Sequence, residues 1–97
     1  MSVRYTEPAF AELAEIISYI AADNPRAASA FIARLERLLE NVREFPHMTR
    51  FSDEEGVHVA PVGRYPYLLF YAVEGEDIVV LHVRHGARRY PARPRNT

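Results

Sequence analysis

The hydrophobic residues in the first half of the chain recur at helical spacing in two long segments. The first segment begins after Thr6, a residue type that favours helix N-caps, and ends near Ala22, where residues 23–25 (Asp-Asn-Pro) form a turn. Glu12 and Glu15, with Ser18, fall on its polar side. Its apolar stripe consists of residues three or four apart: Phe10, Leu13, Ala14, Ile17, Ile20 and Ala21.

The second helical segment has the more regular pattern. It starts at Pro25, a residue tolerated in the first helical turn, and stops before Pro46. Its apolar residues form an unbroken stripe: Ala28, Phe31, Ile32, Leu35, Leu38, Leu39 and Val42. Because only a short turn separates two amphipathic helices, we expect them to form an antiparallel hairpin.

The remaining apolar segments are short, and they alternate or are continuously apolar, which is typical of β-strands. A polar loop is expected at 47–56 and a hairpin turn at 74–77. The predicted strands cover residues 2–5, 57–62, 67–73 and 78–85. This β-α-α-β-β-β order predicts one α+β domain over residues 1–97, a two-layer structure with the helical hairpin packed on a mostly antiparallel sheet.

Both faces of this sheet should carry large apolar groups. The segment before and within the strand at 67–73 contains Tyr65, Tyr67, Phe70 and Tyr71. A two-helix hairpin covers one face, so the other face needs a folded-back tail, a second copy of the chain, or an apolar segment of a partner.

Composition excludes several classes of protein. There is no cysteine, and all 12 basic residues are arginine, so disulfides, thiolate zinc sites, thiol nucleophiles and lysine bases are absent. The longest wholly apolar run, 68–73, is far shorter than the ~20 residues of a membrane span, and the start of the chain does not resemble a secretory signal. We therefore expect a cytoplasmic protein with no membrane association.

The net charge of −1 conceals a basic C-terminal segment. Residues 84–97 hold five of the 12 arginines and no acidic residue. With His85 as a proton-transfer group, this segment could hold RNA phosphates; it could equally bind an acidic protein segment, or be a solvated tail.

Other chemistry has little support in the sequence. His82 and His85 are three apart on a predicted strand, so they should point to opposite faces, and no metal site or other cofactor is expected. Neither a Gly-x-Ser-x-Gly elbow nor a phosphate-binding Gly-rich loop occurs.

The element order and several short segments resemble the ParE/RelE superfamily of bacterial type II toxins. The resemblance extends over residues 2–90, and together the segments are fairly specific. They are Tyr65-Pro66-Tyr67-Leu68-Leu69-Phe70-Tyr71-Ala72-Val73, Ile78-Val79-Val80-Leu81-His82-Val83, Arg84-His85-Gly86-Ala87-Arg88-Arg89, Tyr5-Thr6-Glu7-Pro8-Ala9 and Asp23-Asn24-Pro25-Arg26-Ala27-Ala28. The resemblance implies the toxin component of a toxin–antitoxin system.

The two branches of the superfamily imply different activities. RelE-like members cleave messenger RNA on the ribosome, and here His85, Arg88 and Tyr90 would be the catalytic residues. ParE-like members inhibit DNA gyrase without a catalytic site. Because Leu68 stands where members usually have an arginine, and Tyr90 is not in clean register with the RelE tyrosine, the ParE-like alternative is favoured. A degenerate, non-toxic binding module is the third alternative.

By resemblance, the partner is a cognate ParD-like antitoxin in a hetero-oligomer, with DNA gyrase as target and no sequence-specific DNA binding by this chain. Physically, apolar groove edges and cationic anchors should contact such a partner. The candidates are Phe10, Leu13, Ile17, Leu35, Arg84 and Arg88. For all four apolar residues the alternative is burial in the core between the helices and the sheet, and for Leu35 that alternative is favoured.

Overall fold

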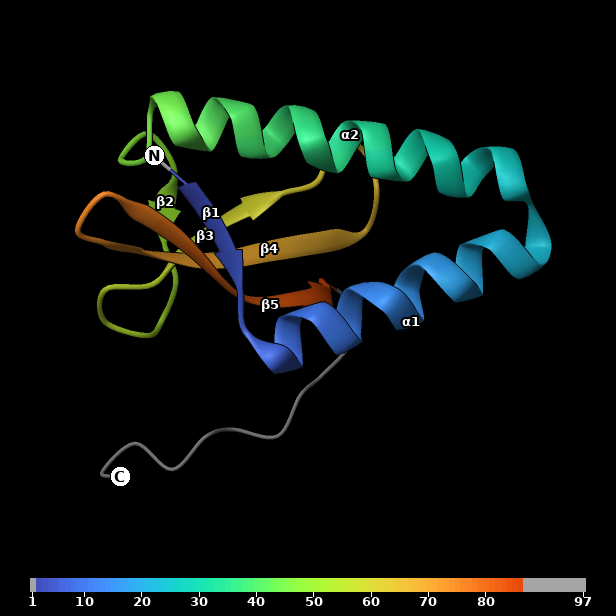
Figure 1. The fold of residues 1–97 in the computed structure, drawn as a ribbon, viewed down its shortest axis with the longest axis horizontal. Coiled ribbons are helices and arrows are strands. Elements are labelled where there is room, and N and C mark those ends of the chain that lie inside the picture. Colours follow the sequence, from blue (N-terminus) through green and yellow to red (C-terminus); the bar gives the residue numbers. More distant parts are fainter. Residues whose placement is uncertain (1, 87–97) are drawn as a thin grey trace.

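A computed structural model describes residues 2–86 and contains two helices and five strands in that range (Figure 1). Their order agrees with the prediction except for one extra strand, β2. The elements are β1 (Ser2–Tyr5), α1 (Glu7–Asp23), α2 (Pro25–Glu44), β2 (Arg50–Phe51), β3 (His58–Pro61), β4 (Tyr67–Glu74) and β5 (Asp77–His85).

The five strands form one mixed sheet in the order β1-β5-β4-β3-β2. Strand β1 runs parallel to β5, with Ser2 opposite Asp77 and Tyr5 opposite Val80, while the other neighbours are antiparallel. The helical hairpin is the connection that returns the chain to the sheet after β1 (Figure 1). The α+β class and the mostly antiparallel sheet are therefore confirmed.

The prediction of a polar loop over residues 47–56 is wrong at residues 50 and 51. Arg50 and Phe51 pair with Val59 and His58, so this segment supplies the edge strand β2. A two-residue strand cannot show the alternation by which strands are recognised, because it is defined only by its partner. β2 covers only the first half of β3, and Pro61 lies at the uncovered half, as its missing N–H requires.

Side-chain caps define the helix boundaries. The Oγ1 atom of Thr6 accepts a hydrogen bond from the N–H of Ala9 at 3.2 Å, which confirms Thr6 as the N-cap of α1. Asn24 is the single residue between the helices, and its Oδ1 accepts from the N–H groups of Arg26 and Ala27. A one-residue connection turns the chain sharply between the helices at one end of the molecule (Figure 1).

The predicted stripe of α2 is confirmed at its centre, whereas the stripe of α1 is rotated from the prediction. Phe31 and Leu35 of α2 lie in the core with Leu69 of β4. On α1, Ala9, which was not part of the predicted stripe, is fully buried, and Phe10, the first residue of that stripe and a candidate partner contact, is 60% exposed. Glu12, predicted to be on the polar side, is turned toward β5. Helix α1 is therefore rotated about its own axis by about one residue relative to the prediction.

A buried hydrogen-bonded cluster fixes the segment after α2 to the sheet. Tyr71 of β4 donates its hydroxyl proton to the carbonyl oxygen of Pro46 at 2.8 Å. Thr49 Oγ1 lies 2.6 Å from Tyr71 Oη and 3.2 Å from Nδ1 of His58. Since each hydroxyl has one proton, Thr49 donates to Tyr71 and accepts from His58. The His58 ring also stacks on Tyr71, with centroids 5.0 Å apart.

The second face of the sheet is less open than the sequence suggested. Leu68, Phe70 and Ala72 point away from the helices but are half-buried, and Val59 is only 3% exposed. The loop between β2 and β3 lies against this face (Figure 1). The β2–β3 loop thus covers part of this face. The sequence alone predicted that a tail, a second copy or a partner would do so.

Candidate partner-binding surface

The carboxylate of Glu12 binds the outer edge of β5 where β1 has ended. Its Oε1 accepts a hydrogen bond from the backbone N–H of Val83 at 3.1 Å and lies 3.1 Å from Nδ1 of His82. Its Oε2 accepts from Nε of Arg84 at 3.3 Å. All three side chains are partly shielded from solvent, at 18–31% exposure. Such charge-assisted bonds are stronger than neutral ones.

The position of Glu12 follows from the topology. β1 pairs with β5 only as far as Tyr5 opposite Val80, so the following residues of β5 lack a strand on that side. Thr6 satisfies the next groups: its N–H donates to the carbonyl of Val80, and its hydroxyl donates to the carbonyl of Leu81. Glu12, in the second turn of α1, then accepts from the N–H of Val83. Thr6 and Glu12 therefore supply the hydrogen-bond partners that a longer β1 would otherwise give to β5.

A groove of about 560 Å³ lies between α1 and the end of β5. Its lining combines aromatic and aliphatic surface with acidic groups, and Tyr19 on its rim is 76% exposed. The residues that line it are Glu12, Glu15, Ile16, Tyr19, Pro66, Tyr67, Val83 and His85. An open groove of this composition suits a peptide segment that carries both apolar and cationic side chains.

A smaller hollow of about 280 Å³ lies on the sheet face opposite the helices. The β2–β3 loop and β5 form its walls, and acidic and basic side chains meet there. Its lining residues are Ser52, Asp53, Glu54, Val57, Phe70, Leu81, His82 and Arg84. His82 and Arg84 also contact Glu12, so the hollow and the Glu12 cluster share these two side chains.

The candidate contact residues of the helices divide into three groups. Phe10 is exposed on α1, and Leu13 and Ile17 are half-buried against the core. Leu35 is 3% exposed and belongs to the core, so it does not form a groove edge in this structure. Phe10 is thus the helical candidate with the most surface to offer a partner.

The cationic and nuclease candidates lie at or beyond the end of β5. Arg84 is half-buried and bound to Glu12. The ring of His85 packs edge-on against Tyr67, with centroids 5.4 Å apart, and lines the groove. Arg88 and Tyr90 lie outside the described residues. His85 and His82 face opposite sides of the sheet, as their spacing predicted, and it is His82 that lies near a carboxylate and an arginine.

Within residues 2–86, no group of three or more His, Asp or Glu side chains could hold a metal ion. Neither helix in that range is long and apolar enough to cross a membrane.

The β1–β5 edge carries a second set of polar contacts. Ser2 donates a hydrogen bond to Asp77, and Arg4 Nε lies 3.3 Å from Oδ2 of the same carboxylate. The Ser2 hydrogen bond, aided by the charge of Arg4, lowers the pKa of Asp77. These contacts hold the start of β1 against β5. Thr6 and Glu12 bind β5 beyond the end of β1.

Sequence reasoning missed Glu12, Tyr19 and His82 as residues of this surface. Glu12 stands one position before Leu13 and four before Ile16, which places it at the border of the buried stripe. That border position was the available signal, because a residue at the edge of the buried stripe is close enough to the neighbouring element to contact it.

The fold defined by this order of helices and strands is also found in toxin–antitoxin proteins. A chain of the solved chromosomal ParDE TA system from P. aeruginosa matches with a TM-score of 0.65 at 24% identity, over 88% of this chain and 95% of that chain. The family model described as "ParE toxin of type II toxin-antitoxin system, parDE" matches residues 3–90. The chain therefore belongs to the ParE toxin family, which confirms the resemblance and its ParE-like branch.

A curated relative points the same way. "Putative toxin Y4kP" of Sinorhizobium fredii (strain NBRC 101917 / NGR234) is 28% identical over 89 residues, which cover 92% of each chain.

Proposed function

We propose that this toxin of a ParDE system acts by binding and inhibiting DNA gyrase, and that a cognate ParD-like antitoxin neutralises it in a hetero-oligomer. This target implies a cytoplasmic protein. The observation that carries the proposal is the engagement of His82 and Arg84 by Glu12. Glu12 holds both side chains at the edge of β5 while Arg84 stays partly exposed, which favours a binding surface over an acid–base site for RNA cleavage.

The surface offered to the antitoxin supports the same interpretation. Phe10 and Tyr19 expose large apolar side chains on α1, and the α1–β5 groove joins apolar walls to carboxylates. Large exposed apolar side chains beside charged groups are typical of protein-binding surfaces. We propose Phe10, Leu13 and Ile17 as apolar contacts, with Arg84 and Arg88 as cationic anchors.

A supercoiling assay with purified gyrase tests the proposal. We expect the toxin to block supercoiling or to trap cleaved DNA, and an equimolar amount of the co-encoded antitoxin to restore supercoiling. Because Arg88 is a proposed anchor, Arg88→Ala should weaken the effect more than Arg64→Ala, a matched change in an exposed loop. Unchanged supercoiling at every toxin concentration would reject gyrase as the target.

A second candidate function is RNA cleavage, favoured by the hollow in which His82 and Arg84 lie near Asp53 and Glu54. Acid, base and cation together could promote proton transfer on a phosphodiester. Growth arrest with cuts mapped in transcripts, abolished by changing His82 in the hollow, or His85 or Arg88 as the resemblance implies, would support a nuclease. Arrest with intact transcripts would exclude it, and harmless expression without antitoxin would indicate a non-toxic binding module.

A further inference from the structure

Helix α1 and the segment that follows β5 have opposite charge. α1 contains four acidic residues and no basic residue, whereas residues 87–97 contain four arginines and no acidic residue. Both belong to one chain, so their attraction has a high effective concentration and involves no loss of translational freedom.

The chain leaves the described structure beside the α1–β5 groove. His85 lines the groove, and the N–H of Gly86 donates to the carbonyl of Pro66, another lining residue, at 2.6 Å. This bond fixes the point of departure. The first residues after Gly86 therefore start within a few ångströms of the groove, whatever their later course.

The groove offers contacts that fit an arginine-rich segment. Glu15 is exposed on the rim of the groove, and Tyr19, which is 76% exposed, lies nearby on the same helix. An arginine can stack its planar guanidinium on a tyrosine ring and pair with a carboxylate at the same time. Ile16 gives the stem of such a side chain an apolar surface.

The lengths also agree. A helix of 17 residues extends about 25 Å, and an extended chain reaches about 3.3 Å per residue. Residues 87–97 can therefore run along much of α1, and the residues nearest Gly86 can reach Glu15 and Tyr19.

We propose that residues 87–97 of this chain dock back into the α1–β5 groove, with an arginine of the pair Arg88 and Arg89 held by Glu15 and Tyr19. The inference does not depend on the target of the toxin. It means that a partner segment entering the groove must first displace the chain's own C-terminal residues.

Paramagnetic relaxation in the full-length protein tests this docking. Because the chain has no cysteine, Ala92→Cys provides a single site for a nitroxide label. We expect the label to broaden the amide signals of Glu15, Ile16 and Tyr19 selectively. Raising the ionic strength from about 0.01 M to about 1 M, which shortens the screening length from about 30 Å to about 3 Å, should remove the broadening.

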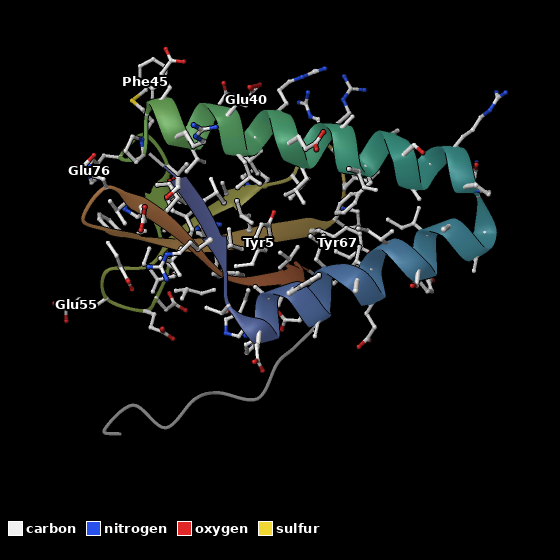
Figure 2. The ribbon with its side chains drawn as sticks, viewed as in Figure 1. Tyr5, Glu40, Phe45, Glu55, Tyr67 and Glu76 are labelled. Carbon is white, nitrogen blue, oxygen red and sulfur yellow. The ribbon has the colours of Figure 1, made fainter. Side chains whose placement is uncertain are left out.

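Charge reversal supplies the matched control. Glu15→Arg should reduce the relaxation enhancement on α1 about two- to fivefold, the equivalent of losing one exposed ion pair. Glu40→Arg, the same change on the exposed side of α2 that points away from the sheet (Figure 2), should leave it unchanged. The proposal is overturned if Glu15→Arg has no effect, or if the strongest broadening falls on another surface. It is equally overturned if broadening appears only between labelled and isotope-enriched molecules in a mixture, since the occupant is then a second copy.

Discussion

At the residue scale, Glu12 shows what helical periodicity cannot determine. Periodicity identifies which residues of α1 share a face, but the rotation of the helix depends on what the helix packs against. Here the open edge of β5 needs an acceptor for the N–H of Val83, and Glu12 supplies it. Phe10 moves out to solvent as a consequence of that rotation.

We predict that Glu12→Gln lowers the free energy of unfolding by about 1–2 kcal/mol. The amide oxygen can still accept from Val83, but the charge-assisted bonds to His82 and Arg84 are lost. Urea denaturation measures the change. Glu15→Gln, an equal change at an exposed position of the same helix, should stay within about 0.5 kcal/mol. Equal losses in both variants would show that Glu12 has no special role.

Tyr71 is a second residue whose role comes from its surroundings. Burial raises the pKa of its phenol, and the hydrogen bond with Thr49 offsets this only in part. Burial also raises the pKa of Tyr5, with a further contribution from the charge of Glu36 on α2. The sequence pattern placed Tyr5 and Tyr71 on strands. It could not predict their neighbours Glu36 and Thr49, because these belong to other segments that only the fold brings close.

We predict that stability falls as the pH rises above about 10. The folded-state pKa of Tyr5 and Tyr71 is raised, so the unfolded chain loses these protons first and is favoured progressively above the unfolded value. Since the chain has neither lysine nor cysteine, tyrosines dominate this alkaline titration. Urea midpoints between pH 9 and pH 11 measure the loss. In the double variant Tyr5→Phe and Tyr71→Phe the slope should be shallower; an unchanged slope would contradict the assignment.

At the element scale, local signals predicted the helices and the long strands well. Thr6, Asn24 and the prolines mark helix ends chemically, and the turn at 74–77 appears as Gly75, with a φ of +62°, between paired Glu74 and Asp77. β2 was missed because two residues carry no pattern of their own. It is a strand only because Arg50 and Phe51 pair with Val59 and His58 of β3, and the cluster around Tyr71 holds the preceding segment in place.

Asn24 should be the most sensitive position between the helices. We predict that Asn24→Ala destabilises the protein by about 1 kcal/mol, because the N–H groups of Arg26 and Ala27 lose their acceptor. Thermal unfolding followed by circular dichroism measures the effect. Asn24→Ser keeps a capping oxygen and should recover most of the loss, whereas equal destabilisation by both variants would argue against the cap.

At the scale of the whole molecule, the parallel pairing of β1 with β5 could not be predicted from local patterns. The two strands are 75 residues apart, as the bond from Thr6 to Leu81 illustrates, and no periodicity specifies such a contact. The candidate surface was predicted in part for the same reason. Phe10 and Arg84 were identified from residue type, but the groove exists only because α1 crosses the end of β5.

We predict that Leu35 contributes mainly to stability and Phe10 mainly to antitoxin binding. Leu35→Ala should lower the free energy of unfolding by about 2–5 kcal/mol, since its side chain is buried. Phe10→Ala should change stability by less than about 0.5 kcal/mol, yet weaken antitoxin binding about fivefold or more. Denaturation and calorimetric titration give the two quantities. Strong destabilisation by Phe10→Ala, with unchanged binding, would reverse the assignment.

The place of β1 in the sheet has a consequence for how the toxin is made. A ribosome adds about 5–20 residues each second. The strand that pairs with β1 lies 75 residues later in the chain, so it is synthesised about 4–15 s after β1. During that interval the apolar faces of both helices have no complete sheet to cover. The sheet of the nascent chain is therefore completed only after β5 has been synthesised, which leaves a period of seconds in which a binding protein made earlier can contact the incomplete fold.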